Sequence, residues 1–307
     1  MRRFPFVTVD VFTDRPFGGN PLAVFLDGRG LSDAEMRRVA AEMNYSETTF
    51  VLPPADPANT ARVRIFTPAE ELPFAGHPNV GTGVVLADRA TAAADGRELL
   101  RFEEAAGLVE VEILRGPGGA VAGARLTAPQ PFAGGAPLPV ADVAACLGLP
   151  PGEVDLAAHP PATASVGLPF VAARLRSLAA LGRCLPDPAA FARATEAHRA
   201  TVPRFFVLAY VPTPGDAAHD VRARMFAAGG GIAEDPATGS AACALVALLA
   251  SLDPAPEATL ELRIGQGHEM GRPSLLLARA EKTGGRVGRV QVGGGAVPML
   301  RGELALP

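Results

Sequence analysis

The chain has 307 residues, a length typical of two domains. Hydrophobic residues make up 48% of it and charged residues 20%, so the chain can bury a sizeable core and intrinsic disorder is excluded. A formal net charge of −4 argues against a nucleic-acid partner, because nucleic-acid-binding proteins carry a clustered basic surface. The three cysteines have no CxxC spacing, which argues against a disulfide framework or a thiolate zinc site.

The N-terminal part of the chain is predicted to form short strands and one amphipathic helix. Alternating apolar and polar residues over 6–12 indicate a strand, and a Gly-Gly-Asn-Pro turn leads to a second strand over 22–26. A capping box at Ser32 begins a helix with apolar residues at 36, 39, 40 and 43 on one face. The helix is expected to break at Asn44, and further strands are predicted over 46–52 and 61–66.

The rest of the chain is predicted to form more strands and two unusually apolar helices. The helices, over 78–86 and 239–252, are apolar on almost every face and should therefore be buried on every side. Strands wrapped around each helix would bury its apolar faces. Further strands are expected over 108–114, 124–127, 169–174, 204–210, 221–226 and 260–264. The longest apolar run is shorter than the roughly 20 residues that a bilayer requires, and the first residues do not resemble a secretory signal. A cytoplasmic protein without a membrane partner is expected.

An internal repeat is the most informative feature of the sequence. Residues 62–66 (RVRIF) match 222–226 (RARMF), and 77–82 (HPNVGT) match 235–240 (DPATGS). Coincidental similarity between two strand–turn–helix segments is the minor alternative. Because the two matches occur in the same order and at nearly constant offset, they indicate a duplicated domain whose halves face each other across a cleft.

Both copies of the second motif lead into an apolar helix, where unpaired backbone N–H groups favour an anion. Gly81 and Gly239 would let the backbone approach a ligand closely, with Thr82 and Ser240 as hydroxyl donors. The alternative is that both hydroxyls only cap their helices, which is the commoner outcome for an isolated motif. The duplication favours a binding site for a small carboxylate substrate.

Three side chains are candidates for proton transfer. His77 and Asp235 occupy equivalent positions of the repeat and should face the cleft from opposite sides. Glu47 begins a strand among hydroxyl and apolar residues, where partial desolvation would suit a carboxyl that carries a proton both ways. Taken alone, a single His is more often structural, and such a Glu is more often an ordinary strand-edge residue. The acids at 70, 71 and 234 are expected to be solvated loop charges.

In four segments the sequence strongly resembles the phenazine biosynthesis PhzF family: 10–25 (DVFTDRPFGGNPLAVF), 44–52 (NYSETTFVL), 64–81 (RIFTPAEELPFAGHPNVG) and 234–242 (EDPATGSAA). A fifth, 265–273 (GQGHEMGRP), resembles the family's C-terminal Gln-Gly-x-x-x-Gly-Arg-Pro segment. The motifs fall in order over essentially the whole chain, so the resemblance is highly specific. One departure is Pro236, where the phenazine enzyme has Ala, and this form resembles family members of unknown substrate.

The resemblance implies the diaminopimelate-epimerase-like α+β fold. Two pseudo-twofold-related domains would each form a β-barrel-like sheet wrapped around a central buried helix, with the active site between them. The domains are expected at 1–128 plus 291–307 and at 129–290. The resemblance also implies a homodimer and no cofactor, and the sequence has no HExxH or similar motif that would indicate a metal.

The resemblance further implies a role for each matching residue. In the phenazine-pathway enzyme, a Glu of the SE[ST]TF motif shuttles a proton between two carbons of trans-2,3-dihydro-3-hydroxyanthranilate, and that Glu corresponds to Glu47. The supporting His of FAGHP corresponds to His77, and the catalytic Asp of EDxATGSA corresponds to Asp235. Substrate-binding residues are expected at the same two motifs: Gly76, Asn79, Thr238, Gly239 and Ser240.

We therefore expect a cofactor-independent isomerase that moves a proton on a small cyclic carboxylate. One alternative is an epimerase acting at a single stereocentre. Its two-thiol form is disfavoured, because positions 77 and 235 carry His and Asp while Cys243 lies one turn inside its helix. The other alternative is a catalytically idle small-molecule binding protein on the same scaffold, which would have no need for Glu47, His77 and Asp235 together.

Overall fold

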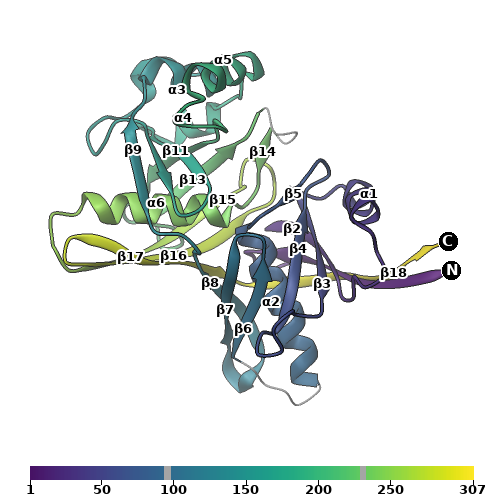
Figure 1. Ribbon diagram of the computed structural model, residues 1–307. Coiled ribbons are helices and arrows are strands. Elements are labelled where there is room, and N and C mark those ends of the chain that lie inside the picture. The colour runs from purple at the N-terminus through teal and green to yellow at the C-terminus, as the bar shows by residue number, and fades with distance from the viewer. Residues whose placement is uncertain (93–97, 229–232) are drawn as a thin grey trace. The chain divides into compact units, whose positions relative to one another are not determined.

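The computed structural model describes residues 1–92, 98–228 and 233–307. The chain forms two compact units: unit 1 comprises Met1–Pro129 with Val292–Pro307, and unit 2 comprises Gln130–Gln291. The helices and strands of both units are drawn in Figure 1. Within the ranges just given, none of the helices combines the length and the apolar character needed to cross a bilayer.

Unit 1 is a strongly curved sheet. Its strands pair in the order β18 (Ala296–Leu306), β1 (Arg2–Val11), β2 (Asn20–Phe25), β3 (Glu47–Leu52), β4 (Ala61–Phe66), β6 (Leu99–Glu104), β7 (Gly107–Arg115) and β8 (Val121–Thr127). The pairs β2–β3 and β4–β6 are parallel, and the short β5 (Glu71–Leu72) adds to β4. Strand β17 (Arg286–Gly294) pairs with β8 and leads into β18, so the sheet closes like a barrel.

Helix α2 (Gly76–Ala92) occupies the centre of unit 1. Residues 76–85 are all buried, and the helix packs against β1, β2, β3, β7, β8 and β18. The predicted burial of this apolar helix is confirmed, although the helix begins at Gly76, two residues before the predicted start. A Cβ on Gly81 would lie 2.6 Å from the side chain of Leu22 and 2.7 Å from that of Val11. Gly81 therefore allows the helix and the sheet to approach closely.

Helix α1 (Asp33–Met43) forms as its capping signals predict. The Ser32 hydroxyl accepts from the backbone N–H of Glu35, and the Glu35 carboxylate accepts from that of Ser32. The helix ends at Asn44, which has a left-handed backbone with φ of 52°. The predicted capping box and break are both confirmed.

Unit 2 repeats this design around a second helix. Its strands pair in the order β9 (Ala133–Pro137), β10 (Ala162–Ser165), β11 (Pro169–Arg174), β12 (Val207–Pro212), β13 (Val221–Phe226), β15 (Ala258–Gln266) and β16 (Ser274–Thr283). The two-residue strand β14 (Glu234–Asp235) adds to β13. Helix α6 (Gly239–Leu252) has the predicted bounds, and it packs against β10, β11, β15 and β16 (Figure 1).

Unit 2 also contains three helices that the sequence did not predict: α3 (Val140–Cys146), α4 (Leu178–Arg183) and α5 (Pro188–His198). They share an apolar cluster with β11 and β12 that includes Phe191 and Phe205. Two short 3₁₀ turns, η1 (Pro117–Gly119) and η2 (Pro151–Glu153), complete the described elements.

The internal repeat has the same contacts in both units. Arg64 on β4 forms a two-pronged ion pair with Glu71 on β5, with N–O distances of 2.7 and 2.6 Å. Arg224 on β13 pairs in the same way with Glu234 on β14, at 2.7 Å for both contacts. The expectation that Glu71 and Glu234 lie in loops was wrong, because both lie in short strands. Each carboxylate pairs with the arginine of its own repeat, although Glu71 stays exposed as expected.

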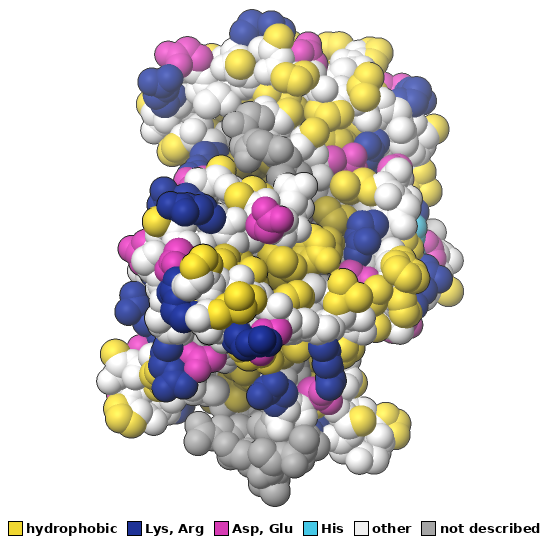
Figure 2. All heavy atoms as spheres, turned by 90° about the vertical axis from the view of Figure 1, so that its right-hand side faces the viewer, with side chains coloured by type: hydrophobic (Ala, Val, Ile, Leu, Met, Phe, Trp, Pro, Cys, Tyr) yellow, Lys and Arg dark blue, Asp and Glu magenta, His cyan; other side chains and the backbone are white. Residues whose placement is uncertain are grey.

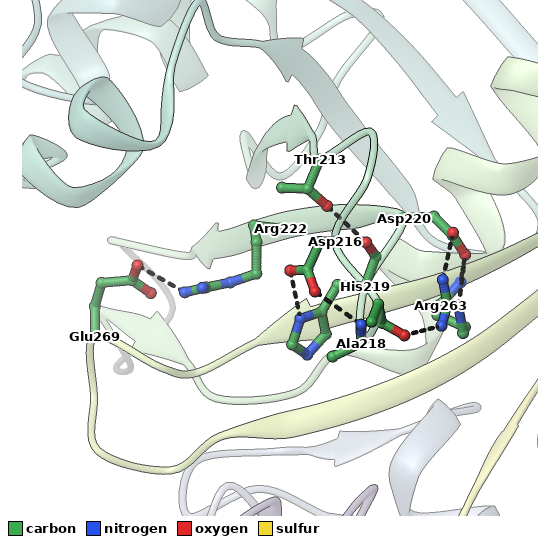
Figure 3. A network of polar contacts seen from close by, with 9 residues as sticks. Thr213, Asp216, Ala218, His219, Asp220, Arg222, Arg263 and Glu269 are labelled. Carbon is green, nitrogen blue, oxygen red and sulfur yellow. Dashed lines mark hydrogen bonds and ion pairs between the residues drawn. The ribbon is translucent and has the colours of Figure 1, made fainter.

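The loop before β13 carries a separate polar network, drawn in Figure 3. His219 Nδ1 lies 3.2 Å from the Asp216 carboxylate, and the Asp220 carboxylate accepts two hydrogen bonds from the side chain and one from the backbone N–H of Arg263 on β15. A Cβ on Gly265 would lie 2.5 Å from the His219 ring, so the ring packs directly over this glycine. The network ties this loop to β15 and gives His219 a structural role.

Candidate active site

Glu47 lies at the first position of β3, where the chain enters the sheet of unit 1. Strand β3 runs parallel to β2, with Glu47 opposite Leu22. The two following threonines, Thr48 and Thr49, are completely buried, whereas the Glu47 side chain keeps 16% of its surface exposed. The sheet thus fixes the backbone of Glu47 while its carboxylate reaches the edge of the core.

His77 lies in the first turn of α2 and faces Glu47. Its Nε2 is 3.4 Å from Oε2 of Glu47, and its Nδ1 is 3.2 Å from the side-chain nitrogen of Asn20. An amide nitrogen can only donate, so Nδ1 of His77 is the acceptor and Nε2 carries the ring proton. The structure therefore brings together Glu47 and His77, two of the three predicted catalytic residues, and directs an N–H towards the carboxylate.

The His77 imidazole is neutral at physiological pH. Its side chain is 4% exposed, and burial lowers its pKa to about 3. Its contact with Glu47 is consequently a 3.4 Å approach of a neutral ring to a carboxyl group, and not an ion pair. A neutral His77 can donate to Glu47 and cannot supply a positive charge.

The other predicted residues at the start of α2 have local partners. Gly76 is the first residue of the helix, and Asn79 is fully buried with its side-chain nitrogen 2.9 Å from the carbonyl oxygen of Ala75. The hydroxyl of Thr82 lies 2.9 Å from that of Thr49 on β3. Thr82 is therefore part of the contact between helix and sheet, and its predicted role as a ligand donor or helix cap was wrong.

Asp235 lies in unit 2, on β14, four residues before α6 begins. Its carboxylate accepts a hydrogen bond from the hydroxyl of Thr238. Gln266, at the end of β15, donates to the carbonyl oxygen of Asp235 at 2.8 Å and accepts from the backbone N–H of Thr238 at 3.2 Å. A Cβ on Gly267 would lie 2.6 Å from the carbonyl oxygen of Pro236, so this glycine lets the two turns meet. The GQG segment therefore holds the turn that carries Asp235.

Helix α6 begins at Gly239, followed by Ser240, which is 8% exposed. Thr238 is the N-cap residue, but its side chain makes no capping hydrogen bond, because its hydroxyl donates to Asp235 instead. Ser240 lies inside the helix, so the alternative that it only caps the helix was also wrong. The N-terminal turn of α6 thus has no side-chain cap from its own N-cap residue.

His77 and Asp235 are not in equivalent local structures, contrary to the sequence prediction. His77 is the second residue of α2, whereas Asp235 belongs to a strand and precedes its helix. The difference arises because α2 begins five residues before Gly81, while α6 begins at the matching Gly239. The repeat aligns the two motifs in sequence but does not give them the same secondary structure.

Sequence reasoning missed two residues that support these side chains. Asn20, whose side-chain amide contacts the His77 ring, was seen only as part of a turn, and no local sequence pattern marks its role. Gln266 was seen only as part of the family's C-terminal segment. The sheet positions the backbone of each residue so that its side-chain amide reaches its partner. A local sequence pattern does not reveal this positioning.

The three cysteines cannot provide a racemase thiol pair. All are buried and free of disulfides. Burial raises the pKa of Cys146 and of Cys184 to about 12, and it raises that of Cys243 further. These thiols are protonated at neutral pH and are poor bases.

The chain matches known proteins over almost its whole length. The family model of phenazine biosynthesis-like proteins, PhzC-PhzF, matches residues 9–302. An uncharacterized isomerase of Mesorhizobium japonicum is 38% identical over 302 residues, covering 97% of this chain and 98% of its own. A trans-2,3-dihydro-3-hydroxyanthranilate isomerase of Pseudomonas chlororaphis is 38% identical over 303 residues, covering 98% and 99%. A solved PhzF-family structure from Bacillus anthracis, 24% identical, has a TM-score of 0.85 over 100% of both chains.

The predicted diaminopimelate-epimerase-like α+β fold is confirmed, and the chain is an isomerase. It belongs to the PhzC-PhzF family of phenazine biosynthesis-like proteins.

Proposed function

We propose that the protein moves a proton, without a cofactor, on a small cyclic carboxylate of the trans-2,3-dihydro-3-hydroxyanthranilate type. The contact between Nε2 of the neutral His77 and Oε2 of Glu47, 3.4 Å apart, is the observation that carries this proposal. The name of the 38%-identical Pseudomonas chlororaphis relative supports the substrate class.

Glu47 is the proposed proton carrier. As a carboxylate it accepts a proton from one carbon of the substrate, and as a carboxylic acid, whose proton exchanges with solvent, it delivers a proton to a second carbon. The product of this shift is an enol, which relaxes to the ketone. The N–H of His77 stabilises the carboxylate form of Glu47 and helps to keep its oxygens in one orientation.

The proposed binding groups are polar atoms at the starts of the two central helices. Gly76 is proposed to bind substrate from unit 1, and Thr238, Gly239 and Ser240 from unit 2. The N-terminal end of α6 suits a carboxylate, because its backbone N–H groups and helix dipole favour negative charge. Asp235 is proposed as a second functional carboxylate that orients the substrate, since the Thr238 hydroxyl and Gln266 fix its position.

We also propose a homodimer in the cytoplasm. The dimer is what the family resemblance implies, and the three free, buried cysteines fit a reducing compartment. Sedimentation equilibrium of the purified protein tests the oligomeric state.

Conversion of trans-2,3-dihydro-3-hydroxyanthranilate, followed by proton NMR, tests the proposed reaction. We expect the dialysed protein to consume the substrate and to keep its rate after treatment with a chelator. Inversion at a single stereocentre would indicate an epimerase, and binding without conversion would indicate an idle binding protein. Activity that disappears with the chelator and returns with zinc would contradict a reaction carried by proton transfer alone.

A further inference from the structure

Glu104 is a buried carboxyl group in unit 1 that the proposed reaction does not use. It is the last residue of β6, and both of its carboxyl oxygens are buried without a hydrogen-bond donor among the described residues. The side-chain oxygen of Asn79, in the first turn of α2, is in the same situation. Burying two acceptor groups without donors lowers the stability of the folded state. The loss is avoided if the Glu104 carboxyl is protonated, because its O–H can then donate a hydrogen bond.

The internal repeat gives Glu104 a counterpart in unit 2. In the parallel pair β4–β6, Arg62 lies opposite Glu103, and in the parallel pair β13–β15, Arg222 lies opposite Gly265. The next residues, Glu104 and Gln266, therefore occupy the same position at the end of their strands. Gln266 uses an N–H donor and a carbonyl acceptor to hold the turn before α6. A neutral carboxylic acid has the same two functions, one O–H donor and one carbonyl acceptor.

We propose that Glu104 is a positioning residue: as a neutral acid it pairs with the Asn79 amide and holds the first turn of α2, which carries His77. Asn79 also donates to the carbonyl oxygen of Ala75, so the pair would connect the end of β6 to the residue before the helix. His77 is two residues from Asn79 in the same turn. Displacement of this turn would change the 3.4 Å contact between His77 and Glu47.

The electrostatic surroundings of Glu104 agree with a neutral acid. Burial raises its pKa to about 8, and the neighbouring Asn79 side chain opposes that rise. The cavity of about 290 Å³ beside it is lined by four other charged residues: Arg62, Arg64, Glu71 and Glu103. Arg64 is bound by Glu71, and Arg62 contributes to lowering the pKa of Glu103. None of the four is among the causes that shift the pKa of Glu104.

The sign of the pH dependence follows from this pKa. Unfolding exposes Glu104, whose ordinary pKa is 4.5, so between pH 4.5 and about 8 the folded state holds one more proton than the unfolded state. This group's contribution to stability is complete below pH 4.5 and is lost as the pH rises through about 8. Over that window the unfolding equilibrium constant should rise by up to about tenfold per pH unit.

Chemical denaturation from pH 5 to pH 9 of the wild type and of Glu104→Gln tests the proposal. Relative to the wild type, the variant should gain stability as the pH rises and reach a plateau above about pH 8. Glu103→Gln is the matched control, because hydrogen bonds from Asn59 and the backbone of Ala55 and Asp56 lower the pKa of Glu103. The control should lose stability at every pH in this range, without a step near pH 8. Parallel curves for the wild type and Glu104→Gln would overturn the proposal.

The positioning of His77 is tested without substrate, by NMR of the ring nitrogens of the wild type. We expect its signals to shift with a midpoint near pH 8, where Glu104 ionises, and to stay constant in Glu104→Gln. Ring signals that do not move between pH 6 and pH 9 in the wild type, or that move equally in both proteins, would overturn the proposal. The importance of this turn for turnover rests on the proposed function, but these readouts do not. A negative result in these two experiments therefore does not contradict the proposed reaction. Likewise, failure of the proposed reaction does not contradict the positioning role of Glu104.

Discussion

The His77 ring shows how a buried residue can be made a donor of fixed direction. Burial lowers its pKa to about 3, which keeps it neutral, and the Asn20 amide at 3.2 Å selects the tautomer with the proton on Nε2. The unfolded ring protonates at its ordinary pKa of 6.5. His77 therefore contributes to stability above pH 6.5, and that contribution is lost as the pH falls from 6.5 towards 3.

Replacing Asn20 should impair the donor function of His77 while leaving the fold intact. In Asn20→Ala the ring loses the group that selects its tautomer, so part of the population would direct an unprotonated nitrogen at Glu47. We expect turnover to fall about tenfold, the usual effect of losing one buried hydrogen bond of about 1.4 kcal/mol.

Nitrogen NMR of the ring should show both tautomers in this variant and one in the wild type. Asn59→Ala is the control: it removes an amide that donates to Glu103, and it should leave the His77 spectrum unchanged. An unchanged tautomer in Asn20→Ala would contradict the assignment of Asn20.

At the scale of elements, the duplicated strand pair supports the turn that leads to Asp235. Arg224 is buried and also donates to the carbonyl oxygens of Leu181 and Cys184, so it connects α4 to β13. Its guanidinium lies 4.8 Å from the ring centre of Phe226, and that of Arg64 lies 5.1 Å from the ring of Phe66. The same Arg–Glu–Phe arrangement therefore stabilises both units.

Removing Arg224 from its ion pair with Glu234 should lower the free energy of unfolding. Arg224→Met would leave the Glu234 carboxylate, 14% exposed, without its cation, and we expect unfolding to require about 3 kcal/mol less free energy. The double variant with Glu234→Met should regain most of this loss, because no unpaired charge remains. Urea denaturation measures both values, and a single variant as stable as the wild type would show that the pair contributes nothing.

The elements that could be predicted are those with a complete local signal. Helix α6 has the predicted bounds because its apolar run begins at a glycine and ends before an aspartate. The apolar run predicts α2 over 78–86, whereas the helix spans Gly76–Ala92. Helices α3 to α5 were missed because short Ala-rich segments have weak periodicity, and their structure depends on tertiary packing. Strand β16 was missed although its buried and exposed residues alternate.

The candidate site was only partly predictable for the same reason. Glu47 and His77 stand out in sequence because each lies in a distinctive motif, but their contact depends on the parallel pairing of β2 with β3 and on the packing of α2. Asn20 and Glu104 carry no local signal at all. Their roles follow from strand register, which a single sequence does not reveal.

At the scale of the whole molecule, the first and last strands of the chain pair with each other. Strand β1 pairs along its length with β18, so the two ends of the chain complete unit 1. On the face drawn in Figure 2, Lys and Arg side chains lie among Asp and Glu side chains, in agreement with the small net charge of −4. The family motifs are spread over both units, which explains why the resemblance covers the whole chain.

The central claim is that one carboxyl group, Glu47, carries the proton, and turnover in heavy water tests it most directly. In the wild type we expect product labelled with deuterium at the carbon that receives the proton. Glu47→Gln keeps the size of the side chain but removes the titratable proton, so turnover and labelling should fall by about 100-fold to 10,000-fold with little change in ligand affinity. Glu42→Gln, the same substitution at an exposed position of α1, should behave as the wild type. Near wild-type turnover in Glu47→Gln would show that another group carries the proton and would make Asp235 the first to examine.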